Sequence, residues 1–419
     1  MKRLVLFFDG TWNRETEKDQ VTNVFRLRRL VEAANIDGTS DDGVPQRIFY
    51  DRGVGTNGPV DRFFGGVLGF GLGDNVRQGY RFLSQFYDPG HVDKATPERS
   101  RAPDEIYVFG FSRGAFTARS LAGFVAAAGL LRKECCDDEN LARAWRYYRT
   151  PVKERMPAKK AELEQLCSPD VRIRLVGVFD TVGSLGIPTG VAGNWGGSYD
   201  HFHDTKLGSS IDVALQALAL DEHRSPFVPA LFARPDHSGN KMVEQVWFPG
   251  VHSDIGGGYG EGKSGRTAIS DISLNWMVQR IRASGCKLRM ADPSVPTSVP
   301  DDPHDSLGWF LFDRRKPMYR LIKGTGMTDP PPGRHESYSL TFPDVSWHEG
   351  VHRSVFDLIV ASRSGNRKAY LPRQLSAVAA DLRSKKLDLV GSDGMPMKDD
   401  STINALLDAA NAAVRRTLY

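Results

Sequence analysis

Short, almost entirely apolar runs recur along the chain and constrain its fold more than any other feature. They cover residues 3–8, 47–50, 105–111, 173–179 and 244–250. Strands without polar alternation are buried on both faces, which is typical of parallel sheets covered by helices. Stretches with apolar residues at helical spacing lie between or after them, at 24–34, 76–86, 115–131, 211–220 and 271–283. This alternation predicts an α/β fold with a mostly parallel sheet and helices on both faces.

Composition divides the 419 residues into three predicted parts. Residues 1–290 hold the alternating pattern and are long enough to form a substantial core. Residues 291–345 are rich in proline and lose periodicity, so we expect an inserted cap or loop region there. Within it, 308–324 mixes aromatic and basic residues, which favours a loop packed on the core over a membrane interface or a substrate cover. Residues 346–419 are expected to form a carboxyl-terminal segment that packs on the core, with two helices within 371–419.

Charge and targeting signals exclude several classes of protein. The chain has 55 basic and 51 acidic residues and no long Lys/Arg block, so nucleic acid is not an expected partner. No apolar run reaches the roughly 18 to 20 residues that span a bilayer. The amino-terminal MKRLVLFFDG begins like a signal peptide, but Asp9 interrupts its apolar run and no cleavage site follows. We therefore expect a protein made in the cytoplasm.

Cysteine usage argues against a structural metal. The four cysteines lack zinc-ligand spacing; they are Cys135, Cys136, Cys167 and Cys286. Free thiols in a reducing compartment are the default for such a chain. We expect no metal and no cofactor.

A serine lies between two glycines where one predicted strand ends. Gly110, Ser112 and Gly114 form the pattern G-x-S-x-G between the strand and the next helix. In a nucleophile elbow the serine takes strained backbone, and the glycines let strand and helix approach closely. The backbone N–H of Arg113, at the amino end of that helix, would stabilise negative charge on the reacting oxygen. The context indicates a nucleophile; the alternative is that Ser112 caps the helix.

A serine nucleophile needs a base and an acid, which this kind of fold places after later strands. Asp180 directly follows the strand 173–179, and His252 follows the strand 244–250. Both emerge at the edge of the sheet where Ser112 lies, so we predict Asp180 as the acid and His252 as the base. Asp180 as a structural cap is the alternative, while Asp254 would brace the histidine loop or bind a cation.

Nine other histidines compete with His252 for the role of base. The main rivals are His348 and His352, in the stretch WHEGVHRSV late in the chain. His252 is favoured because a strand precedes it and a glycine-rich turn follows it.

The turn after the first strand, in the stretch FFDGTWN, completes the predicted site. The backbone N–H of Gly10 or Thr11 would supply a second oxyanion donor, and Asp9 would orient the turn. The stretch partly matches the D-x-D-G-T signature of aspartyl-phosphate phosphatases, but phenylalanine occupies the place of the first aspartate. A metal-dependent hydrolase using Asp9, Asp254 and His252 is a further alternative.

Four separated motifs resemble those of one family. They are LVLFFDGTWN, YVFGFSRGAFTAR, VGVFDTVGSLG and FPGVHSDIGGGY. Together they are similar to the family-one type VI secretion lipase effectors, which are α/β-hydrolases. The resemblance covers most of residues 1–290 and a patch near 346–376. It implies an α/β-hydrolase-like fold in which Ser112 matches the nucleophile, Asp180 the acid and His252 the base.

The family resemblance also implies a substrate. Its characterised members cleave phospholipid acyl chains, mostly as phospholipases A, so we expect a serine esterase that meets a membrane surface. The alternatives are a hydrolase of a soluble ester or thioester and a non-catalytic binding protein on the same fold. An effector would be exported into a target cell without a signal peptide, with an immunity or chaperone protein as its partner.

Overall fold

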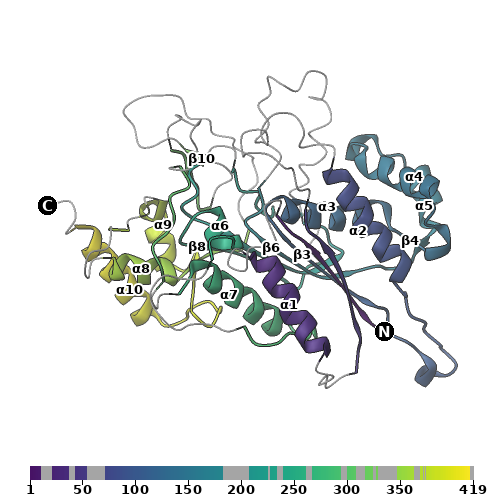
Figure 1. Ribbon diagram of the computed structural model, residues 1–419, viewed down its shortest axis with the longest axis horizontal. Coiled ribbons are helices and arrows are strands. Elements are labelled where there is room, and N and C mark those ends of the chain that lie inside the picture. The colour runs from purple at the N-terminus through teal and green to yellow at the C-terminus, as the bar shows by residue number, and fades with distance from the viewer. Residues whose placement is uncertain are drawn as a thin grey trace.

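One large sheet forms the centre of the computed structural model (Figure 1). The structure describes residues 1–10, 21–36, 43–53, 71–182, 207–224, 227–233, 239–260, 267–293, 300–307, 317–323, 327–328, 347–362, 369–370, 372 and 374–415. Within them the main sheet has eight strands in the order β12-β11-β8-β7-β6-β3-β1-β2. Each neighbouring pair is parallel. The carboxyl ends of all eight strands therefore meet at one edge.

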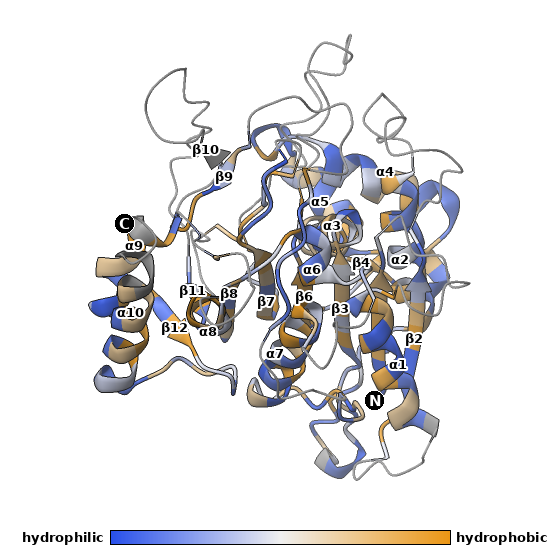
Figure 2. Cartoon of the chain, turned by 60° about the vertical axis from the view of Figure 1, so that its left-hand side comes forward, coloured by the Kyte–Doolittle hydropathy of each residue, from blue (hydrophilic) through white to orange (hydrophobic). Residues whose placement is uncertain are grey.

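The five predicted strands all belong to this sheet, and three others join them. The strands are β1 (Arg3–Phe8), β2 (Gln46–Asp51), β3 (Glu105–Phe111), β6 (Ile173–Phe179), β7 (Ile211–Ala219), β8 (Met242–Phe248), β11 (Glu349–His352) and β12 (Asp388–Val390). Figure 2 shows apolar colour along the strands. The predicted α/β-hydrolase-like class, with a mostly parallel sheet and helices on both faces, is confirmed.

One predicted helix is wrong. The stretch at 211–220 forms β7, a central strand between β6 and β8 in which all nine residues are buried. Its sequence IDVALQALA is rich in alanine and leucine, which are strong helix formers. A strand buried on both faces also lacks polar alternation, so its pattern resembles that of a buried helix. Tertiary packing decides the outcome here.

Helices cover both faces of the sheet. One face carries α2 (Leu72–Phe86), α3 (Arg113–Ala128), α4 (Asp138–Arg149) and α5 (Pro157–Glu164). The other carries α1 (Asn23–Ile36) and α7 (Ile269–Ala283), which lie side by side in Figure 1. Among the described residues, none of the helices combines the length and apolar character needed to span a bilayer.

The carboxyl-terminal part of the chain continues the sheet. After β11 come α8 (Ser354–Ala361), α9 (Gln374–Arg383), β12 and α10 (Asp400–Arg415). The two helices expected after residue 370 are present as α9 and α10. These elements bury an apolar cluster that includes Trp247 of β8 and Val351 of β11. Residues 346–419 thus add strands as well as helices to the core.

Candidate active site

Ser112 lies at a tight turn between β3 and α3. Its backbone has φ of +58°, in the left-handed region that costs a non-glycine residue on the order of 1–3 kcal/mol. Ser112 directly precedes α3 at its N-cap position, but its side chain makes no capping hydrogen bond, which removes the support for the cap alternative. The strained backbone instead exposes the hydroxyl at the carboxyl edge of the sheet.

The two glycines around Ser112 are required by close packing. A Cβ atom on Gly110 would lie 2.4 Å from the carbonyl oxygen of Gly114. A Cβ atom on Gly114 would lie 2.1 Å from the carbonyl oxygen of Phe8 in β1. Real Cβ contacts of this length do not occur, so only glycine allows this approach of strand and helix.

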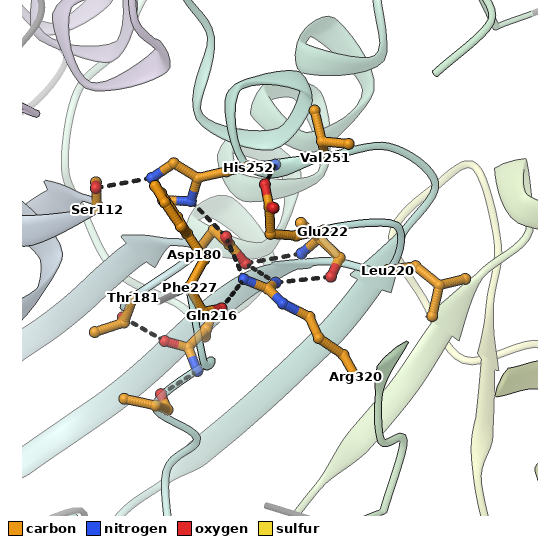
Figure 3. Close-up of polar contacts among 12 residues, drawn as sticks. Ser112, Asp180, Thr181, Gln216, Leu220, Glu222, Phe227, Val251, His252 and Arg320 are labelled. Atoms are coloured by element: carbon orange, nitrogen blue, oxygen red, sulfur yellow. Dashed lines mark hydrogen bonds and ion pairs between the residues drawn. The ribbon is translucent and has the colours of Figure 1, made fainter. Parts of the chain in front are cut away.

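A chain of hydrogen bonds links Ser112 to a histidine and an aspartate (Figure 3). His252 Nε2 is 2.7 Å from Ser112 Oγ, and His252 Nδ1 is 2.6 Å from Asp180 Oδ2. The histidine is 140 residues from the serine and 72 from the aspartate along the sequence. The structure therefore brings together the three residues that sequence reasoning selected from separate strand ends.

Each partner is held by the local fold. Asp180 follows β6 with φ of +39°, and its Oδ1 accepts the backbone N–H of Ala219 at 2.9 Å. His252 begins the short helix α6 (His252–Gly256). The rings of Phe111 and Phe227 lie 4.7 and 4.9 Å from the imidazole. These contacts leave the histidine ring little freedom to rotate away from the serine.

An arginine that sequence reasoning missed completes the surroundings of Asp180. Arg320, in β9 (Tyr319–Arg320), is fully buried and pairs with both carboxylate oxygens, at 2.6 and 3.0 Å. It also donates to the carbonyl oxygens of Ala219 and Phe227, each at 2.7 Å. The sequence signal is a single arginine among apolar residues in PMYRLI, part of the stretch 308–324 that we expect to pack on the core as a loop.

Burial and charge set the protonation of the pair. Burial alone would raise the pKa of Asp180, but Arg320 and His252 outweigh it and hold the pKa below its usual value. Burial also lowers the pKa of His252, against the opposing effect of Asp180. Near neutral pH the arrangement therefore holds a neutral imidazole between a hydroxyl and a carboxylate, as a general base requires.

The family model described as type VI secretion system, phospholipase effector Tle1-like, catalytic domain matches residues 2–280. The chain belongs to the Tle1-like family. The resemblance inferred from four sequence motifs is thus confirmed, and the match spans the strands that carry Ser112, Asp180 and His252.

Individual relatives of this Tle1-like chain match only parts of their own length. YEL023C, an uncharacterized protein of Saccharomyces cerevisiae, is 28% identical over 266 residues, covering 55% of this chain and 34% of that protein. A crystal structure of an uncharacterized Pseudomonas aeruginosa protein is 18% identical with a TM-score of 0.42, covering 98% and 62% of the two chains. The Tle1 effector bound to the VgrG spike of the type VI secretion system is 23% identical with a TM-score of 0.35, covering 63% and 52%. The chain thus spans about a third of the yeast protein, about three fifths of the Pseudomonas aeruginosa chain and about half of the Tle1 chain.

Asp254 braces the histidine loop of this Tle1-like domain. Its Oδ2 accepts the backbone N–H of Val251 at 2.9 Å and that of His304 at 3.1 Å. Its Oδ1 lies 2.6 Å from His304 Nδ1. The loop of His252 is thereby tied to the segment that follows residue 290.

Asp9 lies at the turn after β1 and accepts three hydrogen bonds there. It accepts the N–H of Gly10 at 2.7 Å and the hydroxyls of Thr22 and Tyr50 at 2.7 and 2.8 Å. The Gly10 amide is therefore engaged within the turn, and Thr11 lies outside the described residues. Arg113 is the first residue of α3, and burial lowers the pKa of its guanidinium to about 10.

The structure also bears on the alternative metal site and on the alternative base, His352. No three His, Cys, Asp or Glu side chains converge as metal ligands in the part of the chain that the structure describes. The rival His352 is buried at the end of β11, where its Nδ1 lies 2.8 Å from Ser354 Oγ and its ring stacks on Phe248 at 4.7 Å. Its contacts hold it in the core between β8 and β11.

Proposed function

We propose that this chain is a serine esterase that hydrolyses acyl esters of phospholipids through Ser112, His252 and Asp180. The supporting observation is the hydrogen-bonded series from Ser112 Oγ through His252 to Asp180, at 2.7 and 2.6 Å, in a family described by a phospholipase effector. Asp254, a second carboxylate close to His252 in the sequence, is engaged by Val251 and His304.

The proposed reaction proceeds in two steps. His252 Nε2 takes the proton of Ser112 as Oγ attacks the ester carbonyl, while Asp180 accepts from Nδ1–H and stabilises the imidazolium. The same proton then passes to the leaving alcohol, and the acyl group stays on Oγ. A water molecule, deprotonated by His252, attacks this acyl-enzyme and releases the fatty acid with regeneration of Ser112.

The oxyanion would be held by backbone amides. The first is the N–H of Arg113, because it follows the nucleophile and opens a helix of 16 residues whose amino end favours negative charge. For the second we propose Thr11, since the Gly10 amide donates to Asp9 in this structure. Gly110 and Gly114 allow the close packing at the turn that carries the Arg113 amide, and Asp9 accepts the Gly10 amide in the turn after β1.

The finer assignments rest on the family resemblance. We propose A-type cleavage of membrane phospholipid, peripheral contact with the bilayer and delivery into a target cell, with an immunity or chaperone protein as a partner. Domain limits at 290 and 345, between a hydrolase core, an inserted segment and a carboxyl-terminal segment, are part of the same proposal.

A fluorophosphonate probe tests the nucleophile directly. We expect labelling of the wild type that is absent in Ser112→Ala, and loss of ester hydrolysis by a factor on the order of 10⁴ or more. Ser120→Ala is the matched control, because Ser120 is buried in α3, the helix that follows Ser112, and has no part in the proposed site. Hydrolysis by Ser112→Ala at the wild-type rate would refute the assignment.

Substrate class is tested with phospholipid vesicles. We expect release of fatty acid and lysophospholipid, faster than hydrolysis of a short soluble ester. Phospholipids with a labelled chain at one glycerol position show which acyl bond is cut. A preference for the soluble ester would favour the alternative esterase, and an unlabelled, inactive wild type would favour a binding protein.

A further inference from the structure

We infer that Arg320 is a positioning residue for Asp180, and that through it residues 300–307 and 317–323 form a working part of the active site. The inference rests on the proposed function, because Asp180 matters only if His252 acts as a base. The Arg320 guanidinium is fully buried and donates to both carboxylate oxygens of Asp180, from Nη1 to Oδ1 at 2.6 Å and from Nη2 to Oδ2 at 3.0 Å (Figure 3).

The plane of the guanidinium is fixed from two further directions. Nη1 donates to the carbonyl oxygen of Ala219, the last residue of β7, and Nη2 to that of Phe227. The Phe227 ring in turn lies 4.9 Å from the ring of His252. Arginine has the planar fork that can serve a carboxylate and two carbonyls at once, which a lysine ammonium cannot match. Arg320 thus fixes the position of Asp180 relative to the imidazole.

Charge gives Arg320 a second effect on the same pair. A positive charge beside Asp180 opposes the entry of a proton into the His252–Asp180 pair, whichever of the two residues would carry it. Other titratable or charged groups around the pair come from the loop after β7 and from α6; they are Asp221, Glu222, Arg224 and Asp254. Burial raises the pKa of Asp221 to about 7. The Arg224 side chain donates two hydrogen bonds to Glu222, at 2.9 and 2.8 Å, and its backbone N–H donates a third at 2.9 Å. In the described residues, Arg320 forms its ion pair with Asp180 itself.

The segment that carries Arg320 is fastened to the loops of the site at other points. Ser306 donates to Glu222 at 3.0 Å, and Glu222 accepts the backbone N–H of His252 at 3.3 Å. The Met318 N–H donates to the carbonyl oxygen of His223 at 3.1 Å. With the His304–Asp254 contact, these bonds attach residues 300–307 and 317–323 to the chain around Asp180 and His252. These hydrogen bonds limit how far Asp180 and His252 can move relative to the segment that carries Arg320.

The test compares pH profiles of kcat/KM for a soluble ester in Arg320→Met and Arg320→Lys. The wild-type activity should fall as the pH drops through the pKa of the His252–Asp180 pair. In Arg320→Met we expect this limb to move to higher pH by about 1 unit, because a positive charge is lost. We also expect kcat to fall on the order of 10²-fold while KM changes little, because the acid is misplaced. Arg320→Lys should show smaller changes in the same direction.

Arg280→Met is the matched control. Arg280 is a buried arginine of α7 that pairs with Glu244 through Nε at 2.7 Å, near the amino end of β8 and away from Ser112. Its removal should leave the pH limb in place. A loss of activity in Arg320→Met with an unmoved limb would show a merely structural role.

Arg320→Lys keeps the inference testable if Arg320→Met folds poorly, because the buried charge beside Asp180 is retained. A double variant gives a second, independent comparison. In an Asp180→Asn background, the further change Arg320→Met should lower kcat by no more than a few-fold, because the group on which Arg320 acts is already neutral. An equal loss in both backgrounds, or an unmoved limb in both Met and Lys variants, overturns the inference. Absence of Ser112 labelling in the wild type would instead refute the proposed function.

Discussion

Single atoms decide how closely α3 can approach the sheet. Gly114 lies where the first turn of α3 passes the end of β1, and its missing side chain leaves room for the Phe8 and Asp9 carbonyl oxygens. Gly123, in the same helix, faces the Tyr148 hydroxyl, and a Cβ atom there would meet it at an ordinary 3.5 Å. Close packing therefore requires glycine at position 114, whereas position 123 has room for a Cβ atom.

Replacing each glycine by alanine should change stability in opposite directions. Gly114→Ala should lower the free energy of unfolding by about 1–3 kcal/mol, since the new methyl group overlaps backbone that cannot move away. Gly123→Ala should raise it by roughly 0.5–1 kcal/mol, because alanine restricts the unfolded chain and favours helix. Urea unfolding of both variants checks the pair, and a shift of the same sign in both would contradict the packing described.

At the scale of elements, β11 carries a buried histidine into the core. Burial, and after it the charge of Arg353, lowers the pKa of His352 to about 3. An unfolded chain titrates near 6.5, so between these pH values the unfolded state binds one more proton than the folded state. The stability contributed by neutral His352 is thus present above about pH 6.5 and is lost as the pH falls toward 3.

His352→Gln should flatten the acid side of the stability curve. Between about pH 6 and pH 4 the free energy of unfolding should decline less steeply than in the wild type, by about 1.4 kcal/mol per pH unit. Asp221 is buried in both the wild type and His352→Gln, so its titration contributes equally to the two curves of stability against pH. The exposed His91 provides a control, and His91→Gln should keep the wild-type slope. Unfolding by urea at several pH values measures this, and equal slopes for wild type and His352→Gln would contradict it.

Elements also show how far sequence reasoning reaches. Ser112, Asp180 and His252 could be placed because each follows an apolar run, and parallel strands bring such positions to one edge. β7 could not be recognised, since burial on both faces removes the alternation that distinguishes a strand from a helix. Arg320 could not be paired with Asp180, because no local pattern tells which side chain of an irregular segment returns 140 residues later.

At the scale of the whole molecule, one sheet joins the ends of the chain. β11 pairs with β8, and Trp247 of β8 is fully buried with its indole N–H donating to Glu349 at 2.6 Å. Removal of residues 346–419 would uncover Trp247 and leave the edge of β8 unpaired. An apolar exposed edge of this kind promotes aggregation.

Truncation after residue 345 should therefore fail to give a folded protein. We expect fragment 1–345 to aggregate or to lack the cooperative unfolding of the full chain, since β11, β12 and three helices are lost from the core. Size-exclusion chromatography and thermal unfolding of the fragment beside the full chain measure this. A monomeric fragment that unfolds cooperatively would show that 1–345 is an independent domain.

The position of Arg320 in the sequence has a consequence for the order of synthesis. A ribosome makes Ser112, Asp180 and His252 first, and Arg320 reaches Asp180 only after 140 further residues. Until then the carboxylate lacks its ion pair, so the nascent chain cannot hold the completed geometry. The proposed esterase would in this way lack its complete catalytic arrangement until Arg320 has been made.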